Sequence, residues 1–235
     1  KIVYKLLSKF VFPDFTVFEK NKIKKNLKKI IEGKKIDVVV VFVMPYGLLE
    51  VGEYVKELGC KWVIDIGDPI SNNVARKNDG KELKRLNYEK KHLGIADAII
   101  TTNDETTNYY RKMFAENKNI LIESVYAGIP EEFLNIEKKE LSKKTVKMIY
   151  AGIFYTDGVR DPSNLIEVIE KNKFFEKEIE LSVYGCHLDK FANYKSVNFY
   201  REKIPQKELF EKYKGSDLLL FVDNKSSIQV PSKLF

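Results

Sequence analysis

Hydrophobic and polar positions alternate in a regular way along the chain. Short runs of consecutive apolar residues are each followed by a longer run with apolar residues at helical spacing. In the first half, the predicted strands are residues 37–43, 61–66, 96–102 and 119–125. The first of these, DVVVVFV, is apolar on both faces, so we expect it to be buried on both, as parallel strands usually are.

The helices predicted for the first half fill the gaps between these strands. Two of them are followed by glycines, Gly33 and Gly59, which are typical of helix ends. Thr102 and Glu105 have the spacing of a capping box at the start of the last helix, which runs to Phe114. The other helices are expected over residues 19–31, 47–58 and 81–93.

The same alternation starts again after residues 130–144, which are polar, charged and only weakly periodic. Asp161 and Pro162 suit the N-cap and first turn of a helix that ends at Lys171. The other predicted elements of this half are a helix over residues 205–214 and strands over 146–152, 179–185, 197–200 and 217–222.

Two series of alternating strands and helices predict an α/β protein with two doubly wound domains, each built on a mostly parallel sheet. The first domain is expected over residues 1–136, a linker over 137–145 and the second domain over 146–235. Ligands of such folds bind beyond the carboxyl ends of the strands, so the loops at those ends are the places to search for chemistry.

Composition narrows the class of protein. The 235 residues are 44% hydrophobic and 32% charged, as in a soluble globular protein. The longest apolar stretch, residues 38–44, is far too short for a membrane span. Two cysteines, Cys60 and Cys186, allow neither a disulfide framework nor a zinc site and indicate a reducing cytoplasm. The net charge of +7 favours acidic partners such as phosphates, nucleotides or anionic lipids.

Polar residues and glycines recur in the loops that follow the predicted strands. The clearest cases are MPYG at 44–47, DIGDPISNN at 65–73 and GIFYTDGVRDP at 152–162. A glycine-rich strand end beside a helix start is a natural phosphate site, which makes Gly152 and Arg160 candidates. A tight turn at Gly152 and a surface position for Arg160 are the alternatives.

Other sequence features exclude several kinds of site. His92 and His187 have no serine, cysteine or metal-ligand partner at a suggestive spacing, so we interpret both as structural. The sequence contains no phosphate-loop, dinucleotide-binding, zinc-protease or nucleophile-elbow motif, and no D-x-D metal motif. It also contains no recognisable nucleic-acid-binding module.

The segment from Lys20 to Lys35 contains eight lysines and one glutamate. A solvated helix face is the simplest interpretation of this segment. A patch that contacts an anionic membrane surface is the alternative.

In their order and spacing, these segments resemble glycosyltransferase family 4. FPDF, DVVVVFVMPYGLLEVGEYVKELGCKWVIDIGDPIS, ADAIITTNDETTNYYRKMF and ILIESVYAGIPEEF are similar to its N-terminal half. VKMIYAGIFYTDGVRDPSNLIEVI, ELSVYG, VNFYREKIPQKELFEKYKGSDLLLFV and VPSKLF are similar to its nucleotide-sugar-binding half. The resemblance implies a GT-B fold, two Rossmann-like domains around a cleft, and sugar transfer with retained configuration, without a metal or cofactor.

The resemblance also implies roles for individual residues. Asp68 stands where many relatives have a histidine near the reacting sugar, and some have aspartate. The residues that would border the acceptor are Pro45, Tyr46 and Gly47. The residues that would contact the donor are Gly152, Arg160, Tyr200, Arg201, Glu202, Ser232 and Lys233.

The sequence departs from the family pattern in three places. Relatives have a strand and a glycine-rich loop before the position of Lys1, and they continue PSKLF with a glutamate and further β/α units after Phe235. Ala127 stands where asparagine is common. We therefore expect the chain to be the middle of an enzyme, inactive by itself, whose VPSKLF segment starts the helix that presents that glutamate.

The resemblance, together with the composition, implies a cytoplasmic bacterial hexosyltransferase, for which peripheral contact with the inner face of the cell membrane is an alternative location. It would transfer sugar from a UDP-sugar to a polysaccharide or lipid-linked glycan. The alternatives are a UDP-sugar epimerase of the same fold and a non-catalytic protein that binds nucleotide-sugars or glycans.

Overall fold

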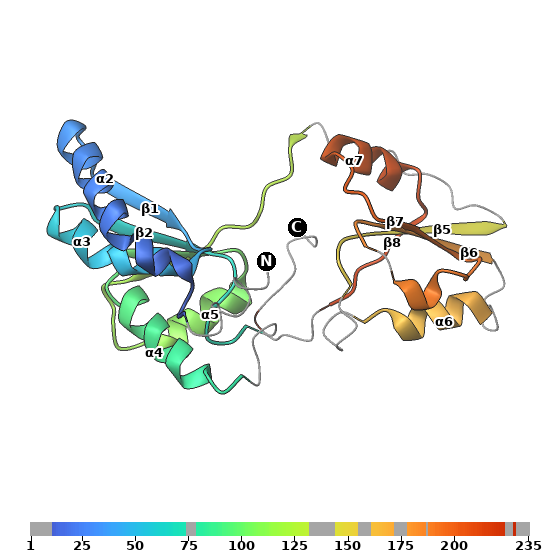
Figure 1. The fold of residues 1–235 in the computed structure, drawn as a ribbon, viewed down its shortest axis with the longest axis horizontal. Coiled ribbons are helices and arrows are strands. Elements are labelled where there is room, and N and C mark those ends of the chain that lie inside the picture. Colours follow the sequence, from blue (N-terminus) through green and yellow to red (C-terminus); the bar gives the residue numbers. More distant parts are fainter. Residues whose placement is uncertain are drawn as a thin grey trace. The chain divides into compact units, whose positions relative to one another are not determined.

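The computed structural model describes residues 11–73, 79–131, 144–154, 161–171, 178–186, 188–223 and 228. The chain forms two compact units, each built on a parallel sheet (Figure 1). The first unit comprises Lys1–Ala127 with Ser226–Leu234, and the second comprises Gly128–Lys225 with Phe235. The predicted α/β class with two Rossmann-like parallel sheets is confirmed.

The sheet of the first unit has the strand order β1-β2-β3-β4, with every neighbouring pair parallel. Its strands are β1 (Val38–Phe42), β2 (Lys61–Ile66), β3 (Ala98–Thr101) and β4 (Leu121–Ser124). The connecting helical elements are η1 (Phe15–Glu19), α2 (Lys20–Gly33), η2 (Tyr46–Val51), α3 (Gly52–Glu57), α4 (Glu82–Leu93) and α5 (Asp104–Met113).

The core of the first unit lies on one face of this sheet. Trp62 and Ile64 of β2, together with Ile99 of β3, are fully buried there. Apolar side chains from all four α-helices complete the same cluster, among them Leu27, Val55, Leu93 and Tyr110. Helical elements that lie where the sequence predicted helices between the strands therefore cover this face.

The expectation that β1 is buried on both faces is wrong for the part of the chain that the structure describes. Val38, Val40 and Phe42 are 48%, 49% and 71% exposed. They share a face because side chains alternate along a strand, and the described helices pack against the opposite face. An apolar run shows that a strand tolerates burial on both sides, but it does not show which sides are covered.

Two helix predictions need correction. The expected helix over residues 47–58 is a 3₁₀ helix, η2, followed by the short α3, and Gly59 closes it with φ +81°. The expected capping box at Thr102 does not form. Asn103 is the N-cap of α5, because its backbone is extended and its side chain accepts a hydrogen bond from Thr106 N at 2.8 Å.

The second unit has the strand order β7-β6-β5-β8, again with parallel pairs. Its strands are β5 (Thr145–Ala151), β6 (Glu178–Tyr184), β7 (Val197–Tyr200) and the short β8 (Leu218–Leu219). Its helices are α6 (Ser163–Lys171), η5 (Asp189–Phe191) and α7 (Gln206–Lys214). As predicted, Asp161 caps α6 by accepting a hydrogen bond from Ser163 N at 2.9 Å.

The end of the predicted second domain differs from the expectation at one described residue. Ile228 is buried in the first unit, where its carbonyl oxygen accepts a hydrogen bond from Thr106 Oγ1 at 2.5 Å. Most of the predicted linker, 137–145, lies outside the described residues, so the expected domain boundary stays a prediction. No helix within the described ranges is both long and apolar enough to span a bilayer.

Candidate functional site

Asp68 lies in the loop that follows β2, at the carboxyl edge of the first sheet. Asp68 is exposed, whereas Pro69 and Ile70 directly after it are buried. Tyr46 Oη donates a hydrogen bond to the carbonyl oxygen of Asp68 at 3.0 Å, which joins this loop to the one after β1. The predicted reaction-centre residue is therefore presented on an anchored loop at the edge where α/β folds bind ligands.

The predicted acceptor-side residues have unequal exposure. Pro45 is exposed, but Tyr46 is 1% exposed and Gly47 is buried. Gly47 N donates to Asp14 Oδ2 at 3.1 Å, and a Cβ atom on Gly47 would lie 2.9 Å from Asp14 Oδ1. Tyr46 and Gly47 thus hold the loop together, and contact of this loop with an acceptor stays a prediction.

The residue before Pro45 has an unusual backbone. Met44 has φ 149°, and it is the one non-glycine residue with positive φ in the described ranges. Such conformations cost energy and recur at functional sites, where the surrounding structure imposes them. Met44 is 65% exposed, so its conformation does not arise from burial of its side chain.

Glu89 is a buried carboxylate beside the Asp68 loop. It was not among the site residues predicted from the sequence. It lies on α4, is 0% exposed, and accepts hydrogen bonds from Ile70 N at 2.5 Å and Tyr110 Oη at 2.9 Å. Burial raises the pKa of Glu89, and these hydrogen bonds oppose that rise. The sequence held one signal: Glu89 occupies the same helix face as the buried Arg85 and Leu93.

Two glycines begin loops at the carboxyl edge of the second sheet. Gly152 has φ 149° and its N–H donates to Tyr184 O at 2.9 Å, while Gly185 has φ +83° and its N–H donates to Tyr200 O at 2.8 Å. Positive φ favours glycine at both positions, since other residues adopt it only with strain. The chain bends at Gly152 in a conformation that favours glycine, which supports a conformational role for this residue, and its contact with a donor stays a prediction.

Tyr200 and Tyr184 form a stacked aromatic pair at this same edge. Their ring centroids are 4.5 Å apart and their planes differ by 9°. Tyr200 remains 44% exposed, which leaves part of its surface accessible to a ligand. The next residue, Arg201, makes an ion pair with Asp189 at 3.4 Å, with side chains 70% and 91% exposed, so the pair contributes little stability.

The remaining predicted donor-side residues divide into two groups. Glu202 is described and exposed. Arg160, Ser232, Lys233 and the predicted VPSKLF helix lie outside the described residues. Over the described ranges, the structure holds no group of three or more histidine, cysteine or acidic side chains with a geometry suited to a metal ion.

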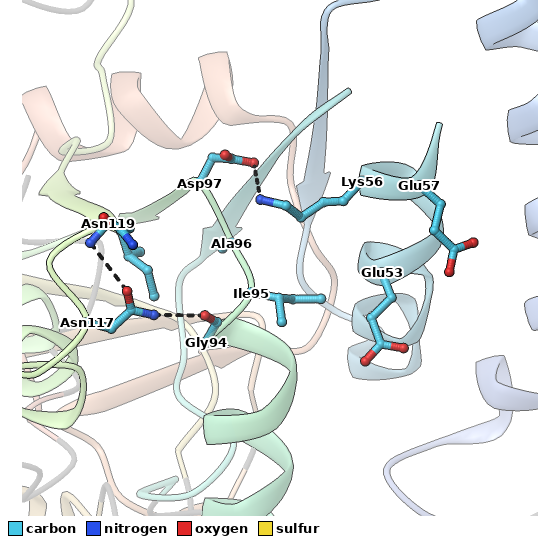
Figure 2. A pocket seen from close by; sticks show the side chains of 10 residues that line it. Glu53, Lys56, Glu57, Gly94, Ile95, Ala96, Asp97, Asn117 and Asn119 are labelled. Atoms are coloured by element: carbon cyan, nitrogen blue, oxygen red, sulfur yellow. Dashed lines mark hydrogen bonds and ion pairs between the residues drawn. The ribbon is translucent and has the colours of Figure 1, made fainter. Parts of the chain in front are cut away.

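A pocket of about 560 Å³ lies at the opposite edge of the first sheet, near the amino ends of its strands. Figure 2 shows Asp97 and Lys56 pointing toward one another at its side, with the two asparagines Asn117 and Asn119 across from them. The Asp97 carboxylate also accepts from Trp62 N at 2.8 Å and from Lys61 Nζ at 3.3 Å. These contacts fasten the start of β2, so we interpret Asp97 as structural.

Replacing Asp97 with asparagine should lower the free energy of unfolding in a pH-dependent way. Although burial raises the pKa of Asp97, hydrogen bonds from Trp62 N, Lys56 and Lys61 together lower it to about 2, from 3.8. The stabilisation is thus present above pH 3.8 and is lost as the pH falls through about 2. We expect a loss of about 1–2 kcal/mol at pH 7. Urea unfolding at pH 7 and at pH 2 measures this loss, and an equal loss at both pH values would contradict the assignment.

The sequence matches no protein-family profile, and no curated protein is similar to it in sequence. Solved structures are similar in fold. Sucrose-phosphate synthase from Thermosynechococcus elongatus matches 87% of this chain and 55% of its own, with 14% identity and a TM-score of 0.63. The E. coli trehalose-6-phosphate synthase bound with UDP-2-fluoro glucose matches 85% of this chain and 56% of its own, with 9% identity and a TM-score of 0.58.

Apo UGT2 from Phytolacca americana matches 90% of this chain and 64% of its own, with 9% identity and a TM-score of 0.50. The chain therefore spans 55–64% of the length of these three structures. At such low identity, the similarity concerns the fold alone. The protein has the GT-B type of fold, with two Rossmann-like units.

Proposed function

We propose that the whole protein is a glycosyltransferase that transfers a sugar from a nucleotide-sugar donor to an acceptor. One observation carries this proposal: two parallel-sheet units of GT-B type each present polar loops at the carboxyl ends of their strands. One solved structure with this fold is bound with UDP-2-fluoro glucose, which supports a UDP-sugar as the donor. A polysaccharide or lipid-linked glycan acceptor and retained configuration are further parts of the proposal.

The proposed mechanism divides the work between the two units. The second unit would bind the donor through Gly152, Arg160 and the exposed surface of Tyr200, and Ser232 and Lys233 would be further donor contacts. The first unit would bind the acceptor near Pro45, and the Asp68 carboxylate would stabilise positive charge that develops on the transferred sugar. Backbone amides, helix N-termini and cationic side chains would stabilise the leaving diphosphate without a metal.

Transfer of labelled sugar from a panel of UDP-hexoses to oligosaccharide and glycolipid acceptors tests this proposal. The full-length protein should form a labelled product with at least one acceptor and release UDP in equal amount. Conversion of the UDP-hexose to its epimer without an acceptor would identify an epimerase instead. Donor binding without either reaction would identify a non-catalytic binding protein.

The outward face of α2 supports a further part of the proposal, contact with an anionic membrane. Ile23, Leu27 and Ile31 pack against the core, so the other side of the helix faces away from it. Lys22, Lys25 and Lys29 are exposed on that side. Phe18, one turn before Lys22, is 73% exposed. An apolar side chain beside a row of lysines is suited to the headgroup region of an anionic bilayer.

Changing Lys22, Lys25 and Lys29 to glutamate should therefore weaken binding to phosphatidylserine vesicles by at least about tenfold, since each basic residue near such a surface contributes about 1 kcal/mol. Vesicle sedimentation at low salt measures binding, and high salt should weaken it for the unmodified protein. The control variant changes three exposed lysines elsewhere in the first unit to glutamate, Lys90, Lys91 and Lys112, so both triple variants have the same net charge. Equal binding by both triple variants would show that α2 is only a solvated face.

A further inference from the structure

A buried side chain of α4, Glu89, binds the loop that carries Asp68 directly. Glu89 is fully buried, and its Oε1 accepts hydrogen bonds from Ile70 N at 2.5 Å and from Tyr110 Oη at 2.9 Å. Its Oε2 accepts a hydrogen bond from Ser71 Oγ, which also lies 2.6 Å from Tyr109 Oη. Both oxygens of the carboxylate are therefore occupied, and two of the three donors belong to consecutive residues of the loop.

These contacts restrict the loop at Asp68 and directly after it. The carbonyl oxygen of Asp68 itself accepts a hydrogen bond from Tyr46 Oη at 3.0 Å. Two residues later in the chain, Ile70 is 0% exposed and its N–H donates a hydrogen bond to Glu89. Tyr46 is in turn held by Tyr88 of α4, whose hydroxyl donates to Tyr46 O at 3.1 Å. Helix α4 thus fixes the Asp68 backbone by two routes.

A buried carboxylate contributes little net stability to a helix. Taking a charged group out of water costs several kcal/mol, which its hydrogen bonds only partly offset, and an apolar side chain of similar volume at such a position is often no less stable. A loop that must keep its backbone at a fixed position gains more from directed hydrogen bonds than from apolar packing. The contacts of Glu89 are of this directed kind, and two of the three end on the loop.

We propose that Glu89 is a positioning residue that holds the backbone of the Asp68 loop where the reaction requires it. The expected effect of Glu89 on kcat rests on the proposed function, but the expected effect of Glu89 on the position of the loop does not. Asp68 is the residue that would meet the sugar, and Glu89 acts on it only through the backbone of residues 68–71. A misplacement of about 1 Å at a reacting group lowers rates by up to about a hundredfold.

Three variants of the full-length protein test the proposal. Glu89→Met keeps the volume but removes every acceptor, so the Ile70 N–H loses its partner. Glu89→Gln keeps a carbonyl oxygen for Ile70 N and Tyr110 Oη, and its amide can donate to Ser71 Oγ instead of accepting. Asp97→Asn is the matched control, because it removes a carboxylate that hydrogen-bonds a backbone N–H at the opposite edge of the same sheet.

Two measurements are made on each variant. Amide hydrogen exchange reports the protection of Ile70 and Ser71, independently of any activity. Sugar transfer from the UDP-hexose that is active with the unmodified protein gives kcat and the donor KM. We expect Glu89→Met to exchange the Ile70 amide at least about tenfold faster and to lower kcat about tenfold with the KM within about twofold. Glu89→Gln should restore both. Asp97→Asn should leave kcat and the donor KM unchanged, and it should not speed exchange of the Ile70 amide more than that of a core amide such as Ile99.

Two outcomes overturn the proposal. Unchanged protection of Ile70 in Glu89→Met would show that the carboxylate does not hold the loop. A Glu89→Gln variant as slow as Glu89→Met would show that Glu89 transfers a proton or acts through its charge. If Glu89→Met does not fold, Ser71→Ala replaces it, with an expected threefold to tenfold fall in kcat, roughly, at constant KM. If the unmodified protein transfers no sugar, the proposed function fails, and amide exchange alone decides whether Glu89 positions the loop.

Discussion

Replacing Asp68 with asparagine is expected to lower kcat for sugar transfer by about a hundredfold or more while the fold remains intact. The side chain is exposed at the carboxyl edge of the first sheet, and the loop is held by the Asp68 carbonyl oxygen, which the substitution leaves in place. Asparagine has nearly the same shape as aspartate but carries no charge. It would therefore bind the substrates without stabilising the positive charge of the transition state.

The measurement is kcat and KM in the transfer assay, together with the melting temperature. Asp37→Asn is the matched control, because Asp37 is also exposed but precedes β1 at the opposite edge of the sheet. The control should have unmodified kinetics. A normal kcat with a lowered melting temperature in Asp68→Asn would show that Asp68 is structural.

The largest effect on stability is expected from Trp62→Ala. Trp62 is 0% exposed at the centre of the first core, and truncating a buried tryptophan costs about 3–5 kcal/mol. The surroundings cannot close the resulting cavity easily, because the indole lies directly against the backbone of α3: a Cβ atom on Gly52 would be 2.5 Å from Trp62 Nε1. The loss is a large part of the stability of a typical domain.

Urea unfolding followed by circular dichroism measures this loss, since Trp62 is the one tryptophan of the chain and its fluorescence is lost in the variant. Trp62→Phe is the control. Its cost should be only about 1–2 kcal/mol, because phenylalanine retains most of the apolar volume and removes a buried indole N–H that has no hydrogen-bond partner among the described residues. Equal losses in both variants would contradict a cavity as the cause.

The alternation of strands and helices, and with it the class of fold, was readable from local sequence. Runs such as residues 61–66 and the helix starts at Asp161 and Pro162 depend on side-chain periodicity and on caps, which act over a few residues. The same is true of the loops: strand ends followed by glycine and polar residues correctly placed Asp68 and Gly152 at carboxyl edges of the two sheets. Local sequence did not decide the helix start where two cap residues compete, as at Thr102 and Asn103.

The sequence by itself thus determined which elements form, their order and the loops where chemistry is to be sought. Only the tertiary structure decided which faces are covered, because the exposure of Val38, Val40 and Phe42 depends on where other elements pack. It also showed that Tyr46 and Gly47 hold their loop together, through contacts to residues 22 and 33 positions away. Glu89 and its loop lie 19 positions apart in the chain, and such a pairing leaves no periodic signal in the sequence.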